Sequence, residues 1–148
     1  MKATALAEPA RGPIPGRVGR AALGAALISA LANVAIGSVL RRGLAIDSAF
    51  APLTPGPIVV FTVALTLIGG AVFGVMSRRR QADAVPRFTV VAVIVTIVSL
   101  AAPLSLLGAT EAQWPGVSPT AAFALMPLHL LAATVLVLTI RRSFRGSL

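Results

Sequence analysis

Residues 21–40 read AALGAALISALANVAIGSVL, a stretch that contains no Asp, Glu, Lys or Arg. Three more stretches of this kind follow, over residues 57–77, 88–108 and 120–140. A helix rises about 1.5 Å per residue, so about 20 residues cross the roughly 30 Å hydrocarbon core of a bilayer. The sequence therefore predicts an all-α integral membrane protein, a bundle of four transmembrane helices over these residues.

The composition supports a membrane protein. The chain has 148 residues, of which 57% are hydrophobic and 11% charged, and its mean hydropathy is +0.93. This is too apolar for a small soluble domain. The net charge of +9 comes from arginines that flank the apolar stretches, so we expect membrane lipids as partners and no nucleic acid. The chain has no cysteine, which excludes disulfides and thiolate metal sites.

The arginines also predict the orientation. If both termini are cytoplasmic, all of the 13 Lys and Arg residues except Arg41 and Arg42 lie inside. The positive-inside rule thus favours an N-in, C-in protein of the plasma membrane. The predicted parts are a disordered basic tail over 1–19, a transmembrane domain over 20–142 and a short cytoplasmic tail over 143–148. We expect the long stems of Arg41 and Arg42 to reach the outer headgroups.

A cleavable signal peptide is the alternative for the first stretch. A basic segment precedes it, and Ala30, Leu31 and Ala32 have the small-x-small form of a cleavage site. However, the apolar sequence continues to Leu40 and completes a full span. We therefore favour a first transmembrane helix.

Polar and small residues within the stretches predict the interior of the bundle. Small residues recur at helical spacing, among them a GxxxG element from Gly70 to Gly74, and they suit close helix packing. Counted from the cytoplasmic end, one polar residue of each span lies about 17 to 19 Å deep. These four residues form a predicted polar layer near the middle of the bilayer: Asn33, Thr66, Ser99 and His129.

Two prolines lie in the outer halves of the third and fourth stretches. Pro103 has no N–H to donate to the carbonyl of Ser99, and Pro127 has none for that of Phe123. We expect both prolines to bend their helices. We also expect His129 to point into the bundle, near Ser99 and its freed carbonyl, and to donate one hydrogen bond there.

Two interpretations of the polar layer remain open. In the first, it is a hydrogen-bonded clasp in a non-enzymatic packing or interaction module, which associates with itself or with another membrane protein. In the second, it is a small-molecule or ion site centred on His129, in a protein of the transporter type. The spans contain no carboxylate for proton-coupled export, and a bis-histidine haem would need a second copy of the chain. Ser99 and His129 lack the orienting acid of a hydrolase. We predict no catalytic residue, no metal and no cofactor.

Several segments together carry a resemblance to a known family. They are an Arg-Gly junction after the first span with Asp47 beyond it, the arginines 78–80, the segment SLAAPL from Ser99 and the segment MPLHL from Met126. Over about residues 20–142 the chain resembles a family of small four-helix membrane proteins of high-GC, actinobacterial-type organisms, classed as a domain of unknown function. In that family a methionine often directly precedes the histidine, whereas Pro127 and Leu128 intervene here. The resemblance implies the topology and no activity, cofactor or substrate.

Overall fold

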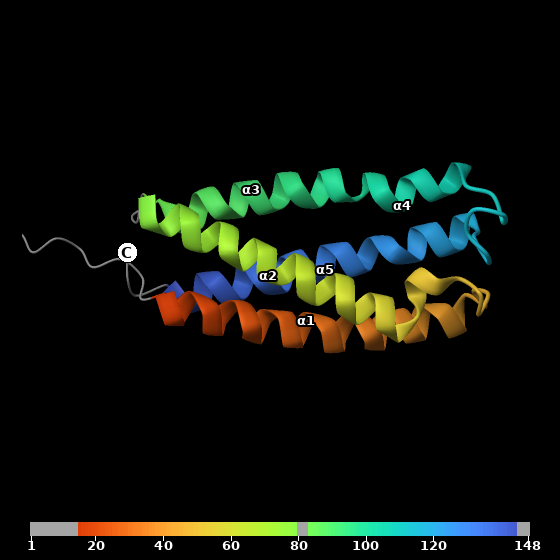
Figure 1. The fold of residues 1–148 in the computed structure, drawn as a ribbon, viewed down its shortest axis with the longest axis horizontal. Coiled ribbons are helices and arrows are strands. Elements are labelled where there is room, and N and C mark those ends of the chain that lie inside the picture. Colours follow the sequence, from red (N-terminus) through yellow and green to blue (C-terminus); the bar gives the residue numbers. More distant parts are fainter. Residues whose placement is uncertain (1–14, 80–82, 145–148) are drawn as a thin grey trace, which may run out of the picture.

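Four long rods of helix run side by side in the computed structural model, which describes residues 15–79 and 83–144 (Figure 1). Three of them are single helices, α1 (Pro15–Gly43), α2 (Pro55–Arg79) and α5 (Pro119–Phe144). The other is divided into α3 (Ala84–Ser99), α4 (Ala101–Ser105) and the 3-10 turn η2 (Leu106–Gly108). A second 3-10 turn, η1 (Ala51–Leu53), lies between α1 and α2.

All four rods are long and apolar enough to cross a membrane, which confirms the predicted fold. The helices extend beyond the predicted spans and into both segments predicted as tails. Residues 15–19, predicted to be disordered, form the start of α1, because a proline fits the first position of a helix. Residues 143 and 144 belong to α5, because Phe144 is buried in the core. The rest of the predicted tails, residues 1–14 and 145–148, lies outside the described residues.

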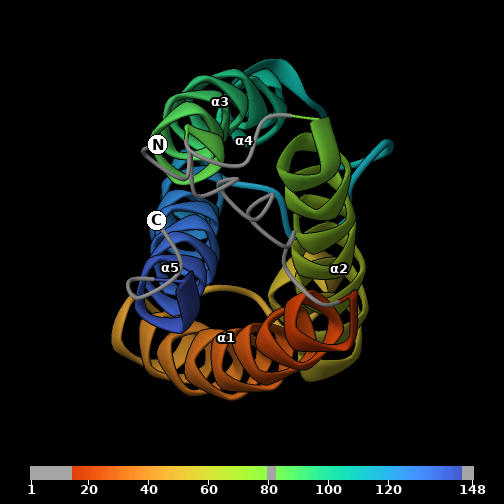
Figure 2. The same ribbon diagram turned by 90° about the vertical axis from the view of Figure 1, so that its left-hand side faces the viewer.

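The four rods form a ring in which α1 and α3 lie opposite each other (Figure 2). Helix α1 packs chiefly against α2 and α5, whereas α3 touches α2 and α5 and makes no contact with α1 within the described ranges. The most apolar window of the third span is only 6% buried, against 33%, 28% and 22% for the other spans in chain order. The third span is therefore the least integrated member of the bundle.

An apolar cluster built around three aromatic rings fills one end of the bundle. The ring centroid of Phe73 on α2 lies 5.3 Å from that of Phe88 on α3 and 5.1 Å from that of Phe144 on α5. The guanidinium of Arg17 lies over the Phe144 ring, 5.2 Å from its centroid. We call this the ring cluster; its buried members are Ala25, Phe73, Ala84, Phe88, Leu136, Ile140 and Phe144.

A second apolar cluster fills the opposite end, beneath the loops. We call it the loop cluster; its buried members are Ile46, Phe50, Leu53, Ile58, Ala121, Ala124 and Leu128. The two loops that cover this cluster, between α1 and α2 and between η2 and α5, contact each other at Gly116, whose φ is +73°. A β carbon at that position would lie 2.8 Å from the backbone nitrogen of Phe50. The carboxylate of Glu111 accepts a hydrogen bond of 2.9 Å from the Gly116 N–H.

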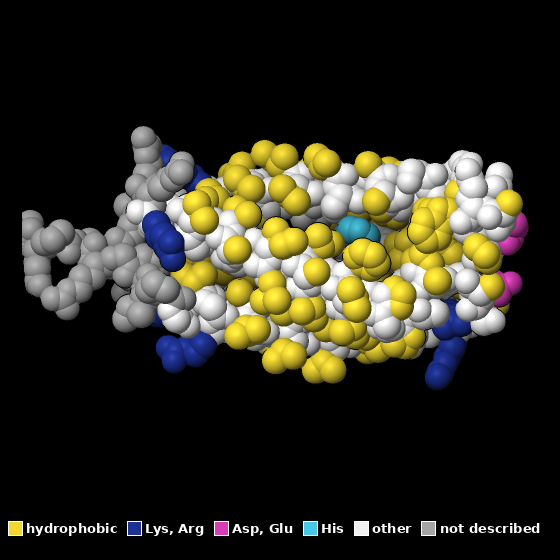
Figure 3. All heavy atoms as spheres, viewed as in Figure 1, with side chains coloured by type: hydrophobic (Ala, Val, Ile, Leu, Met, Phe, Trp, Pro, Cys, Tyr) yellow, Lys and Arg dark blue, Asp and Glu magenta, His cyan; other side chains and the backbone are white. Residues whose placement is uncertain are grey.

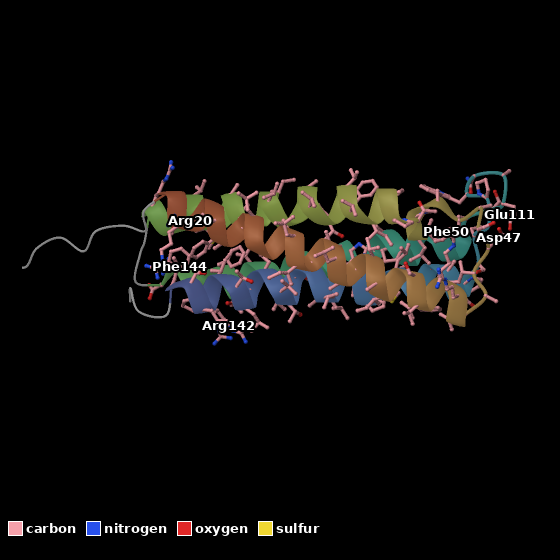
Figure 4. All side chains as sticks on the ribbon, turned by 90° about the horizontal axis from the view of Figure 1, so that it is seen from below. Arg20, Asp47, Phe50, Glu111, Arg142 and Phe144 are labelled. Carbon is pink, nitrogen blue, oxygen red and sulfur yellow. The ribbon has the colours of Figure 1, made fainter. Side chains whose placement is uncertain are left out.

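The charged side chains lie at the two ends of the bundle (Figures 3 and 4). At the ring-cluster end lie Arg20 and Arg142, together with Arg87, which forms an ion pair of 3.3 Å with Asp83. Asp47 and Glu111 lie at the loop end, where the side chain of Arg41 donates a hydrogen bond of 3.1 Å to the Ser48 carbonyl. The first and last described residues both lie at the ring-cluster end of the bundle, as expected if they share one side of the membrane. That this side is cytoplasmic remains a prediction.

Candidate functional site

Four buried polar side chains lie in the middle of α1 and α2, between the two apolar clusters. On α1, Ser29 is 0% exposed and Asn33 is 2% exposed. On α2, Thr62 is 7% and Thr66 is 3% exposed. Polar groups in the middle of a membrane are costly unless they find partners, so the hydrogen bonds of these four residues decide what this region can do.

Asn33 joins three helices. Its side-chain nitrogen donates a hydrogen bond of 3.0 Å to the hydroxyl of Thr62 on α2. It donates another, of 3.1 Å, to the carbonyl oxygen of Leu128 on α5. A carbonyl oxygen has two lone pairs, so Leu128 can accept this bond in addition to one from its own helix. We call these three residues the Asn33 clasp.

The predicted polar layer is only partly assembled by hydrogen bonds. Asn33 donates hydrogen bonds to two other helices, but its partner on α2 is Thr62, which is not a member of the predicted layer. Ser99 is half-buried and its hydroxyl donates to the Thr96 carbonyl of its own helix, at 2.7 Å. His129 is also half-buried, and its Nδ1 lies 3.0 Å from the Leu125 carbonyl oxygen. The expected bond from His129 to another helix is therefore wrong, because the ring reaches a carbonyl one turn back in α5.

The predicted polar layer omitted Thr62 and Ser29, although the spacing of small and polar residues places both on the predicted inner faces of the bundle. Thr62 lies one helical turn before Thr66, and Ser29 one turn before Asn33, so each pair shares a helix face. The layer was chosen by depth, which selects one residue per helix and overlooks the neighbour one turn away. Helix face is the better guide to these four residues.

Two atoms of this region have no hydrogen-bond partner. They are the Ser29 hydroxyl oxygen and the side-chain oxygen of Asn33, and both are buried. A buried acceptor without a partner costs about 1 to 3 kcal/mol. These two unsatisfied atoms therefore lower the stability of the packing on the inner face of α1.

The two prolines differ in their local structure. Helix α3 ends at Ser99 and α4 starts at Ala101, so the third rod is interrupted at Leu100, before the fully buried Pro103. The Leu100 N–H is shared between the carbonyls of Thr96 and Ile97. By contrast, α5 runs through Pro127 as one helix. The interruption in the third rod lies at the depth of the polar region.

A lateral opening exposes His129. Helix α2 crosses the bundle obliquely, so that it starts near α1 and ends near α3, and it diverges from α3 and α4 toward the loop end (Figures 1 and 2). Figure 3 shows the single histidine of the chain (cyan) in the hollow between α2 and the α3–α4 side. The Nε2 atom of His129 makes no hydrogen bond with any described residue. The Nε2 atom is therefore a polar atom within a candidate membrane span that has no hydrogen-bond partner among the described residues.

The other polar side chains of the described spans offer few groups to a ligand. No group of three or more His, Cys, Asp or Glu side chains that could hold a metal ion occurs within residues 15–79 and 83–144. The hydroxyls of Thr89, Thr96 and Thr134 donate to carbonyls one turn back in their own helices. The free Nε2 of His129 is thus the feature of the described spans best suited to meet a molecule from outside.

Comparison with known proteins places the chain in a family but does not assign an activity. The model of a family of unknown function (DUF6069) matches residues 10–146. No curated protein and no solved structure matches the chain.

Proposed function

The chain belongs to this family of unknown function, and we propose that it is a non-enzymatic membrane protein that holds a small lipid-soluble molecule beside His129. The observation that carries the proposal is the free Nε2 of His129 in the opening between α2 and the α3–α4 side. Polar atoms within a membrane normally find partners or line a cavity. A nitrogen that has no partner among the described residues, on a side chain that the opening exposes, is suited to a partner that arrives from the bilayer.

Both ends of the bundle support access from the side. The ring cluster fills the end that carries Arg20 and Arg142, and the loop cluster fills the other. A water-soluble substrate or an ion would have to pass one of these apolar clusters. The described acids Asp47, Asp83 and Glu111 lie outside the spans, so an ion pathway through the middle would lack carboxylates.

The surroundings of His129 support a binding role and not a catalytic one. A hydrolase needs a nucleophile within hydrogen-bonding reach of the base and a group that orients the base. The Ser99 hydroxyl donates to the Thr96 carbonyl, and the group that orients His129 is the Leu125 carbonyl. A backbone carbonyl holds an imidazole in place but is not the orienting acid of a hydrolase.

Mass spectrometry of protein purified in native lipid tests the proposal. We expect a small molecule to copurify with the wild type and to be lost in His129→Leu. The matched control is Thr134→Val, which removes an exposed hydroxyl of the same helix that is bonded to the Leu130 carbonyl. Equal small-molecule content in all three proteins would contradict the proposal. An absorption spectrum of the same samples would show whether the molecule is a haem.

A packing module is the second candidate, and a separate observation favours it. The Asn33 clasp ties α1, α2 and α5 together, while the third span remains only 6% buried and presents Val90, Ile94 and Val98 outward. In this proposal a second copy of the chain packs on α3. Beta-branched side chains suit such an interface because they lose little conformational freedom on packing.

Cysteine cross-linking separates this second candidate from the first. The chain has no cysteine, so Ile94→Cys on α3 and Leu31→Cys on α1 each give a single thiol on an exposed face. Oxidation in native membranes should give covalent dimers with Ile94→Cys and none with Leu31→Cys. Equal cross-linking at both positions, or at neither, would argue against an interface on α3.

The cellular location is part of the same proposal. We place the protein in the plasma membrane with both ends of the chain in the cytoplasm. The arginines at the ring-cluster end support this orientation, because positive residues accumulate on the cytoplasmic side of membrane proteins.

A further inference from the structure

The hydrogen bond of His129 fixes which nitrogen can meet a ligand. The Leu125 carbonyl oxygen can only accept, so Nδ1, which lies 3.0 Å from it, must carry the hydrogen. In the neutral ring, Nε2 then holds a lone pair and acts as an acceptor. The side chain therefore presents an acceptor of fixed tautomer to the opening.

The third rod adds no free donor at this depth. Ala84 at the start of α3 and Phe144 at the end of α5 both belong to the ring cluster. Ser99 and His129 each lie about 22 Å along their helices from these residues, so they are at a similar depth. The hydroxyl hydrogens of Thr96 and Ser99 are directed to carbonyls of their own rod, at 2.6 and 2.7 Å. Any hydrogen between His129 and a ligand must therefore come from the ligand.

The positions of the charged residues exclude further classes of ligand. An ammonium group could donate to Nε2, but it would be a charge in the bilayer centre, away from the described acids, which lie outside the spans. A haem iron could bind Nε2, but its propionates would lack cations, because Arg20, Arg142 and their neighbours also lie at the ends. Quinones and esters carry acceptors only and cannot bond to another acceptor. A neutral hydroxyl satisfies all of these conditions.

We propose that the molecule held beside His129 is a lipid-soluble alcohol or phenol whose hydroxyl donates a hydrogen bond to Nε2. This inference rests on the proposed function and specifies its ligand class. The hydrocarbon part of the molecule would lie in the opening between α2 and the α3–α4 side, where the surface is apolar (Figure 3). The hydroxyl would satisfy the one nitrogen of the ring that the protein leaves without a partner.

Nitrogen-15 NMR can observe this bond directly, because the chain contains one histidine. Protein labelled with 15N-histidine would be placed in nanodiscs of phosphatidylcholine. Without ligand, the spectrum should show the tautomer with hydrogen on Nδ1. Farnesol should then move the Nε2 signal upfield in a saturable way, as expected when a lone pair accepts a hydrogen bond. A spectrum with hydrogen on Nε2 would overturn the inference.

Farnesyl methyl ether is the matched probe, since it has the same chain and cannot donate. One net hydrogen bond is worth about 1 kcal/mol, so the ether should bind about fivefold more weakly and leave Nε2 unshifted. His129→Leu should remove the preference for the alcohol, whereas His129→Gln, which retains an acceptor oxygen, should keep part of it. Thr134→Val should behave as the wild type.

The possible outcomes distinguish a wrong ligand class from a wrong proposed function. If alcohol and ether bind equally and perturb His129 equally, the opening takes lipid-soluble molecules but the hydroxyl class is wrong. If neither farnesol nor a long-chain phenol changes the His129 signals, both the ligand class and the proposed function fail. A preference for the alcohol that persists in His129→Leu would place the bond elsewhere and overturn the inference alone.

Discussion

Gly70 of α2 lies so close to Ala22 of α1 that a β carbon at position 70 would collide with the β carbon of Ala22. The neighbouring atom is the short, rigid end of an alanine and not the tip of a flexible chain. The two helices can therefore accommodate a substitution only by moving apart. Contacts of this kind replace the hydrophobic driving force that lipid removes from helix association.

Gly70→Ala should destabilise the bundle. Overpacking of a close contact costs about 1 to 3 kcal/mol, and the backbone must shift to relieve it. Gly74→Ala is the control within the same GxxxG element, because its β carbon would meet Val18 at an ordinary 3.5 Å. Loss of helicity during titration with SDS would measure both variants. Equal stability of the two would show that the helices are not held at the distance observed.

The Asn33 clasp should contribute through two coupled hydrogen bonds. Asn33→Leu keeps the branched shape and removes both bonds together with the unpartnered oxygen, so we expect a net loss of about 1 kcal/mol. Thr62→Val removes one acceptor and should cost about 0.6 kcal/mol. In the double variant the losses should not add, because the Thr62 bond is already absent in Asn33→Leu. Fully additive losses in the same unfolding assay would contradict the clasp.

Ser29→Ala should be neutral or stabilising, by up to about 1 kcal/mol. The Ser29 hydroxyl is fully buried without a partner, and replacing an unsatisfied polar group removes its cost. Ser77→Ala is the contrasting variant. The Ser77 hydroxyl donates to the Gly74 carbonyl at 3.0 Å, so its removal should be slightly destabilising. If Ser29→Ala were the more destabilising of the two, the hydroxyl would have a partner, such as a bound water.

Reporter fusions test the orientation. The arginines predict a cytoplasmic signal from fusions after residues 80 and 148, and an external signal from a fusion after residue 114. In the structure the first and last described residues lie at the same end of the bundle. A cytoplasmic signal after residue 114 would invert the topology and place the loop cluster inside the cell.

The fold could be predicted from the sequence because hydropathy and length act on every residue of a span. The stretches that lack charge became four helical rods, which differ from the prediction at their ends and in the interruption of the third rod at Leu100. Those ends depend on single contacts, such as the burial of Phe144 against Phe73, which no window of hydropathy reports. The oblique course of α2 was likewise not predictable, because it follows from where small residues such as Gly70 meet another helix.

The site was harder to predict, because each polar residue had several available partners. Depth correctly placed Asn33 in the interior, but it could not choose between Thr62 and Thr66, which share a face of α2. For His129 the sequence indicated a partner on another helix, whereas a carbonyl of its own helix was closer. Local bonds of this kind compete with interhelical ones, and only the positions of the helices decide between them.

The shallow burial of α3 means that the bundle can open in parts. If α3 moves away from α5, Phe88 leaves the ring cluster, but the bonds of Asn33 to α2 and α5 are not broken. Native proteins open in units whose free energies follow their buried contacts. Amide exchange should therefore be faster along α3 than along α1 under native conditions. Such an opening would widen the gap beside His129 while the other three helices stay assembled.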